Sequence, residues 1–231
     1  MKKILTKILS NKPEYFQHIE FLDKKYNSIF TKNLLKEKNE INILSQLCEI
    51  EFGIIINNLF IDITYEPTIN KKKPDWLVIS NDQKIIFEVK NVNPNEKEIQ
   101  KRINLVKEDK YSGLTNKSFT FTTSDFQSQI SKITEKETTY RNLITCNDYK
   151  LIICFDVSNL QDDFITDTDI KQVFDFENKY SLINKFPDFC KNVAGIIVKP
   201  IFPSTIFIEN KKSNFKLNQE NLKILKTINY P

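Results

Sequence analysis

The sequence predicts an α/β fold in which helices flank a mixed central β-sheet. Apolar residues first recur at the spacing of amphipathic helices, up to about residue 57. Short apolar runs bounded by turn-forming residues then follow, and these are typical of strands. A chain that runs helix, three strands, helix and strand usually packs its helices on the faces of a layered sheet.

The first helices are expected over residues 1–33, where the apolar spacing is broken near Pro13. A longer helix is expected over residues 34–57, because two apolar stripes run along it. Residues 59–66 then alternate as a strand would and end before Pro67. The two stripes consist of Ile41, Leu44, Cys48, Phe52 and Ile55, and of Ile43, Leu47, Ile50 and Ile54.

A β-hairpin is predicted next. The apolar runs 74–79 and 85–90 flank residues 80–83, which are all turn formers. We expect one face of this hairpin to be buried. The residues expected to be buried are Trp76, Val78, Ile85, Phe87 and Val89.

The hairpin brings polar side chains together on its other face. If Ser80 lies opposite Gln83, Asp75 falls directly across from Glu88. Directly opposed side chains have Cβ atoms about 5 Å apart, so two carboxylates there repel each other. A hard divalent cation would remove that repulsion. Lys90 follows Glu88 on the same face, because strand side chains alternate.

Further elements follow along the chain. A polar helix is expected over 96–106, and Ser124 begins a second helix with capping-box spacing. Residues 149–157 are almost continuously apolar, as in a central strand covered on both faces. Late strands are expected over 193–198 and 205–209.

Composition excludes several classes of site. The 231 residues suffice for one sizeable domain. Three glycines, none of them starting a phosphate-binding loop, exclude P-loop and dinucleotide-binding motifs. His18 is the one histidine, which excludes multi-histidine metal centres, and it fits a structural role better than a catalytic one. The four cysteines show no close pairing, and no run is long enough to span a bilayer, so we expect a cytoplasmic protein that does not contact membranes.

Positive charge is local, since the formal net charge is only +4. A lysine run, Lys71, Lys72 and Lys73, directly precedes the Asp75 strand. Such a run is usually a solvated surface, but lysines beside a metal site are also well placed to hold phosphates. The sequence leaves both interpretations open.

The residues Pro74-Asp75 and Glu88-Val89-Lys90, on adjacent strands between helices, resemble the motif of the PD-(D/E)xK phosphodiesterase superfamily. The resemblance spans roughly residues 40–160. It implies the restriction-endonuclease-like fold, a three-layer core with a mixed central sheet between helices. An isolated Glu-x-Lys is more often a solvent-facing ion pair. The opposed Asp75 favours a site here.

The family often has a further glutamate on the helix before the first strand, and two residues are candidates. Glu49 has the familiar spacing to Tyr65-Glu66-Pro67, whereas Glu51 falls between the two apolar stripes, where a carboxylate is unusual. We favour Glu49 and keep Glu51 as the alternative.

The resemblance implies a role for each residue. Asp75, Glu88 and the Val89 carbonyl would bind Mg²⁺, with Mn²⁺ as a substitute. Lys90 would orient the attacking water and offset charge in the transition state, and Glu49 would assist the hydrated metal.

Nucleic acid is the expected partner. Lys71, Lys72 and Lys73 would bind its backbone, together with three polar residues of the helix that follows Ser124. Those three residues are Gln129, Lys132 and Lys136. The resemblance favours DNA over RNA.

The resulting hypothesis is a Mg²⁺-dependent endodeoxyribonuclease of the restriction, defence or mobile-element kind. The alternative is a catalytically inactive nucleic-acid-binding or scaffold protein on the same fold. Cutting both strands of a duplex would favour a homodimer. The expected organisation is a helical appendage at 1–33, the nuclease-like domain at 34–210 and a basic tail at 211–231.

Overall fold

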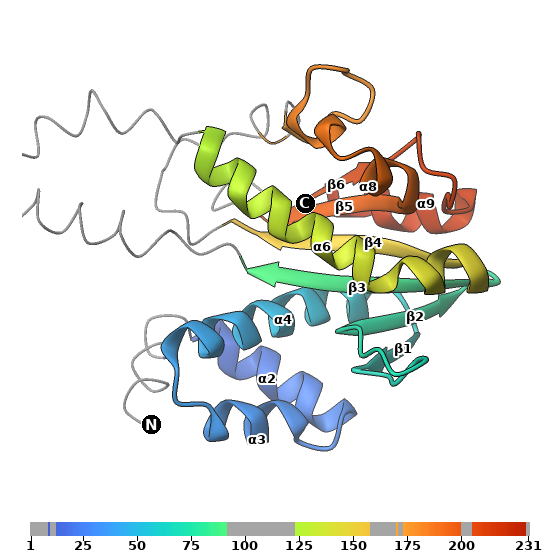
Figure 1. The fold of residues 1–231 in the computed structure, drawn as a ribbon. Helices are drawn as coiled ribbons and strands as arrows, with labels where there is room; N and C mark the ends of the chain where they lie inside the picture. The colour runs from blue at the N-terminus through green and yellow to red at the C-terminus, as the bar shows by residue number, and fades with distance from the viewer. Residues whose placement is uncertain are drawn as a thin grey trace, which may run out of the picture.

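The computed structural model describes residues 9, 13–91, 123–157, 170, 173–199 and 205–229, without the side chains of residues 40 and 123–133. Its helices and strands are shown in Figure 1. They are α2 Glu14–Lys25, α3 Ile29–Lys36, α4 Glu40–Leu59, β1 Asp62–Tyr65, β2 Trp76–Ser80, β3 Gln83–Asn91, α6 Thr123–Asn147, β4 Tyr149–Asp156, the 3₁₀ helix η2 Leu182–Lys185, α8 Pro187–Asn192, β5 Val193–Lys199, β6 Ile206–Glu209, α9 Gln219–Lys226 and the 3₁₀ helix η3 Thr227–Asn229.

The strands form a six-stranded open sheet in the order β1-β2-β3-β4-β5-β6. The first three strands are antiparallel to one another, β3, β4 and β5 are parallel, and β6 is antiparallel to β5. The predicted α/β class with a mixed sheet is therefore confirmed. Parallel neighbours need crossover connections, and α6 lies in the connection from β3 to β4.

Helices cover both faces of this sheet (Figure 1). One face packs against α2, α3, α4 and α9, and β3 contributes Phe87 to that core. The other face packs against α6, η2 and α8, and β3 contributes Ile86 to it. Because strand side chains alternate, Glu88 faces the α6 layer and Val89 faces the α4 layer.

The helix expected over 34–57 is interrupted in the structure. It divides into α3, which ends at Lys36, and α4, which begins at Glu40. The Glu37 carboxylate accepts hydrogen bonds from the backbone N–H groups of Lys38 and Asn39. The Asn39 side chain then caps the start of α4 by accepting a hydrogen bond from the backbone N–H of Ile41. These local side-chain bonds compete with the helical ladder and stop it. The apolar stripes are buried in part, since Ile41 stays exposed.

Residues from both flanking segments lie in the same core as the centre of the chain. Leu22 and Phe30 of the predicted appendage, and Leu222 and Leu225 of the predicted tail, belong to one buried cluster. Part of the tail forms α9, which the sequence analysis did not predict. The expected helix over 96–106 lies outside the described residues.

Trp76 anchors the hairpin to the helices. Its side chain is fully buried between rings of Tyr26, Phe30 and Tyr65. Gly53 of α4 lies directly against it, and a Cβ added there would be 2.3 Å from Trp76 Cζ2. The close approach of α4 to β2 therefore requires glycine at this position.

We predict that Gly53→Ala lowers the free energy of unfolding by about 2 kcal/mol, because the new methyl group overpacks the Trp76 indole. This loss should exceed the gain in helix propensity. Urea unfolding measures it, with Asn58→Ala on the exposed side of α4 as the matched control. A Gly53→Ala protein as stable as the control would contradict this account of the α4–β2 contact.

Candidate active site

Asp75 and Glu88 lie opposite each other at the start of the β2–β3 pair. The observed register pairs Ser80 with Gln83 and Trp76 with Phe87, as predicted, and Asp75 is the next residue outward. The backbone N–H of Val89 donates a hydrogen bond of 2.6 Å to Asp75 Oδ2. The Asp75 carboxylate is thereby attached to β3 beside Glu88.

Glu88 is held from the α6 side. Its exposed fraction is 2%, and Tyr140 donates its hydroxyl to Glu88 Oε2 at 2.7 Å. Lys136, one turn earlier on α6, forms an ion pair with Glu88 Oε1. A buried carboxylate needs such partners, because burial of an unpaired charge costs several kcal/mol. Lys90 follows on the same face of β3 and is partly exposed.

The two helical glutamates have different surroundings. Glu49 accepts a hydrogen bond of 3.3 Å from the Tyr65 hydroxyl and lies close enough to Asp75 to raise its pKa. Glu51 instead forms an ion pair with Lys199 on β5. Of the two candidates, the structure therefore brings Glu49, and not Glu51, to the Asp75–Glu88 pair.

Glu51 belongs to a second polar cluster. Its neighbours include Tyr15 of α2, whose pKa is raised by burial and by the Glu51 and Asp156 carboxylates. Asp156 and Lys199 are direct neighbours on β4 and β5. This cluster fastens α2 and α4 to the carboxyl ends of the parallel strands, which is a structural role.

The carboxylates of Asp75, Glu88 and Glu49 repel one another. Burial raises the pKa of Asp75 well above its usual range, and the charges of Glu88 and Glu49 raise it further. The pKa of Glu49 rises to about 7, through burial and through the charges of Glu66 and Glu88. Burial lowers the pKa of Lys136, but the attraction of Glu88, Asp75 and Glu49 outweighs that effect, so its pKa is raised.

The donor set suits a hard cation in its chemistry. Asp75, Glu88 and the Val89 carbonyl offer only oxygen, the ligand type that Mg²⁺ and Mn²⁺ take. A carboxylate has about four lone-pair positions, so Glu88 can bind a cation while it accepts the hydrogen bond of Tyr140. The ammonium of Lys136 would compete with that cation. Within the described ranges, no three side chains of histidine, cysteine, aspartate or glutamate gather as a metal-binding group.

The predicted nucleic-acid contacts are distributed unevenly. Lys71, Lys72 and Lys73 are exposed, as a contact with a backbone would require. Lys136 is about one-third exposed and is engaged by Glu88, so it lies inside the site and not along an open groove. The side chains of Gln129 and Lys132 are outside the described residues, although α6 includes both positions.

Tyr140 is the site residue that the sequence analysis missed. A tyrosine on an amphipathic helix usually indicates core packing, and Tyr140 is indeed 3% exposed. The available signal was its spacing of one helical turn from Lys136, which places both side chains on one face. His18 lies away from this site, edge-on to Tyr15 in α2.

Comparison with known proteins adds nothing to this geometry. No protein-family model matches the chain, and neither the curated proteins nor the solved structures include a significant match to it. Among the residues described here, none of the helices has the length and apolar character needed to cross a bilayer.

Glu49→Gln should change how stability depends on pH. Folded Glu49 keeps its proton up to about pH 7, whereas the unfolded chain releases it near pH 4.5. Between these values the folded state binds more protons, so the free energy of unfolding falls as pH rises. We predict that the variant is more stable than the wild type at pH 8 by about 2 kcal/mol, with little difference near pH 5.

Urea unfolding in EDTA at both pH values provides the measurement. Glu20→Gln on the exposed side of α2 is the control and should shift both values equally. A Glu49→Gln effect of the same size at both pH values would show that Glu49 is not protonated by its surroundings.

Proposed function

We propose that this protein is a metal-dependent phosphodiesterase, an endodeoxyribonuclease on a restriction-endonuclease-like fold. The observation that carries the proposal is the pairing of Asp75 with Glu88 across two strands beside Lys136, with Glu49 near enough to raise the pKa of Asp75. Carboxylates crowded in this way lower the stability of the fold. A group of side chains that costs stability is a candidate for a functional site. Holding a divalent cation against a phosphodiester is the purpose that fits oxygen donors and ammonium groups together.

Each residue would have a separate task. Asp75, Glu88 and the Val89 carbonyl would hold Mg²⁺ or Mn²⁺, which when bound polarises a phosphoryl oxygen and acidifies water. Lys90, on the same face as Glu88, would orient the attacking water and offset negative charge on the phosphorus centre. Attack in line with the leaving oxygen would leave a 5′-phosphate and a 3′-hydroxyl, as the family resemblance implies.

Glu49 would handle a proton. With a pKa of about 7, this carboxyl is present in both protonation states near neutral pH. Its hydrogen bond with Tyr65 keeps it oriented next to Asp75. Glu49 in its ionised form would accept a proton from water, or would hold the hydration shell of the cation.

Tyr140 and Lys136 would position Glu88. Burial and the nearby Glu88 charge raise the pKa of Tyr140, so its hydroxyl keeps the proton that it donates. Lys136 balances the carboxylates before a cation arrives. DNA is preferred over RNA on the strength of the resemblance, and a homodimer would be needed to cut both strands in one encounter.

A catalytically inactive nucleic-acid-binding or scaffold protein is the second candidate. One observation favours it, because both oxygens of Glu88 are already engaged, by Lys136 and by Tyr140. If Lys136 permanently replaced the cation, the fold would keep its nucleic-acid surface without hydrolysis. The two candidates differ in one measurable property, the cleavage of DNA when Mg²⁺ is present.

We predict that the wild type cleaves plasmid DNA with Mg²⁺ and that EDTA abolishes the reaction. Asp75→Asn and Glu88→Gln should each lower the rate at least about a hundredfold, because a neutral amide is a poor cation ligand. Both substitutions preserve side-chain size, and Gln can still accept the Tyr140 hydrogen bond. Agarose gels measure the rate, and thermal unfolding shows that the variants fold.

Asp62→Asn on the exposed start of β1 is the matched control, since it also replaces a carboxylate on the β1–β2–β3 part of the sheet. It should cleave at the wild-type rate. Equal cleavage by Asp75→Asn would remove the assignment, and absence of cleavage by the wild type with either metal would favour the inactive candidate.

A further inference from the structure

The β1–β2 hairpin continues beyond the sheet, and we call residues 66–75 the basic finger. Glu66 donates its backbone N–H to the Asp75 carbonyl at 2.9 Å. Ile69 and Lys72 then exchange two backbone hydrogen bonds of 2.8 Å each. These pairs keep the register in which Tyr65 pairs with Trp76. The finger therefore continues the hairpin beyond the sheet through one isolated bridge and ends in a two-residue turn.

The turn at the tip has an unusual residue. Asn70 and Lys71 have φ values of 47° and 66°, the left-handed conformation of a type I′ turn. Glycine is the usual second residue of such a turn, because a Cβ is strained there. Lys71 takes that position in place of glycine. Asp82 takes the same position in the turn of the β2–β3 hairpin.

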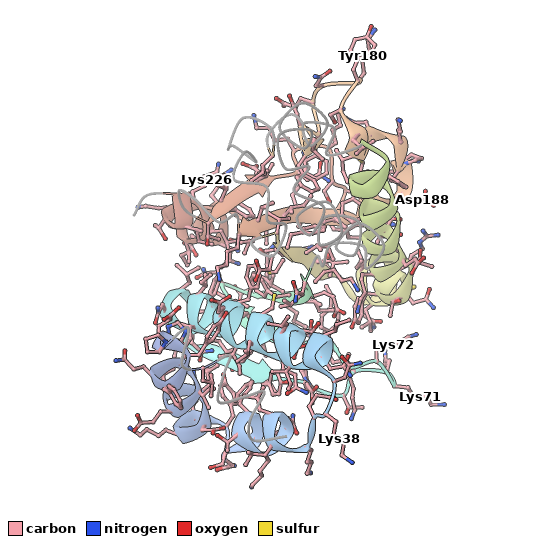
Figure 2. The ribbon with its side chains drawn as sticks, turned by 90° about the vertical axis from the view of Figure 1, so that its left-hand side faces the viewer. Lys38, Lys71, Lys72, Tyr180, Asp188 and Lys226 are labelled. Carbon is pink, nitrogen blue, oxygen red and sulfur yellow. The ribbon has the colours of Figure 1, made fainter. Side chains whose placement is uncertain are left out.

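The tip carries unneutralised charge. In the described part of the chain, no carboxylate forms an ion pair with Lys71, Lys72 or Lys73. Figure 2 shows Lys71 and Lys72 at the outer end of the finger, pointing away from the rest of the molecule. The finger thus presents adjacent ammonium groups on a hydrogen-bonded support.

The base of the finger is tied to the Asp75–Glu88 pair. Asp75 is its last residue, and the Tyr140 hydroxyl that donates to Glu88 also lies 3.2 Å from the Lys73 carbonyl oxygen. The Cα atoms of Lys72 and Asp75 are at most about 11 Å apart, given the reach of an extended chain. The charges of the tip are therefore held at a limited distance beyond the carboxylates.

We infer that the basic finger binds backbone phosphates that flank the cleaved one, and so holds the polynucleotide against the carboxylate site. This inference rests on the proposed function, because the polymer is taken to be hydrolysed at Asp75 and Glu88. A small diester would occupy the carboxylate site without reaching Lys71 and Lys72. A polymer would contact both regions and would gain affinity from the release of counterions.

The test compares a polymer with a small diester. Lys71→Gln/Lys72→Gln is assayed with Mg²⁺ on a synthetic DNA duplex and on bis(4-nitrophenyl) phosphate. We expect kcat/KM on the duplex to fall about tenfold or more at moderate salt, well beyond any loss on the small diester. The salt dependence of duplex binding, as a log–log slope, should weaken by about 2, since two phosphate contacts are lost.

The charge-matched control is Lys223→Gln/Lys226→Gln on α9. Lys226 lies on the opposite side of the molecule from Lys71 and Lys72 in Figure 2. This control should retain the wild-type values on both substrates. Equal losses in the two double variants, or equal losses on duplex and small diester, would overturn the inference.

A second pair of variants separates charge from backbone strain. Asn81 and Asp82 form the turn of the β2–β3 hairpin with φ values of 47° and 61°, so Asp82 has the same strain as Lys71. Lys71→Gly and Asp82→Gly should both raise the unfolding temperature. Lys71→Gly alone should weaken duplex binding. Weakened binding in both variants would show that turn geometry, and not the ammonium group, matters.

Fluorescence anisotropy with a labelled duplex in EDTA keeps this inference separate from the hydrolase proposal. Finger-dependent binding without hydrolysis in Mg²⁺ would support the basic finger and overturn the proposed function. If the Lys71→Gln/Lys72→Gln variant hydrolyses and binds the duplex as the wild type does, the proposed function stands and the inference about the basic finger is overturned.

Discussion

The pairing of β2 with β3 is the constraint on which the rest of the structure depends. Its register places Asp75 across from Glu88, and the backbone N–H of Val89 attaches the Asp75 carboxylate to the neighbouring strand. A shift of one residue would turn one of the two carboxylates toward the opposite face of the sheet. The buried Trp76 opposes such a shift, because its indole fills the space left by Gly53. Core packing therefore maintains the repulsion between the two acids.

Two of the charge clusters inside the fold each include a glutamate of α4. Glu49 and Glu51 are two residues apart, so the helical turn of roughly 100° per residue directs them to different partners. Glu51 meets Lys199 near the ends of β4 and β5, where one ammonium balances it. Glu49 meets two further carboxylates and shares Lys136 with them. The Glu51 cluster has two carboxylates, Glu51 and Asp156, beside Lys199, whereas at the Asp75–Glu88 site three carboxylates share Lys136. The larger excess of carboxylates is therefore at the Asp75–Glu88 site.

Local pattern was sufficient to predict the hairpin, its register and its buried face, because strand alternation and turn chemistry act over a few residues. The interruption between α3 and α4 was missed because the apolar periodicity continues across Glu37, whose side chain satisfies backbone groups that a helix would use. The sequence favoured Glu49 only through resemblance, since the helical wheel also pointed to Glu51. Tyr140 was missed because its role arises from α6 packing over β3, a contact between distant parts of the chain.

Titration calorimetry with Mg²⁺ and Mn²⁺ tests the convergence of carboxylates on a cation most directly. The pKa of Glu49 is raised to about 7, so this carboxyl holds a proton in part of the molecules at neutral pH, and a bound cation would displace that proton. Titrations in buffers with different ionisation heats should therefore show metal binding with proton release near neutral pH, and Asp75→Asn should lose both. Absence of binding, or binding by Asp75→Asn with the same affinity and proton release as the wild type, would contradict the account.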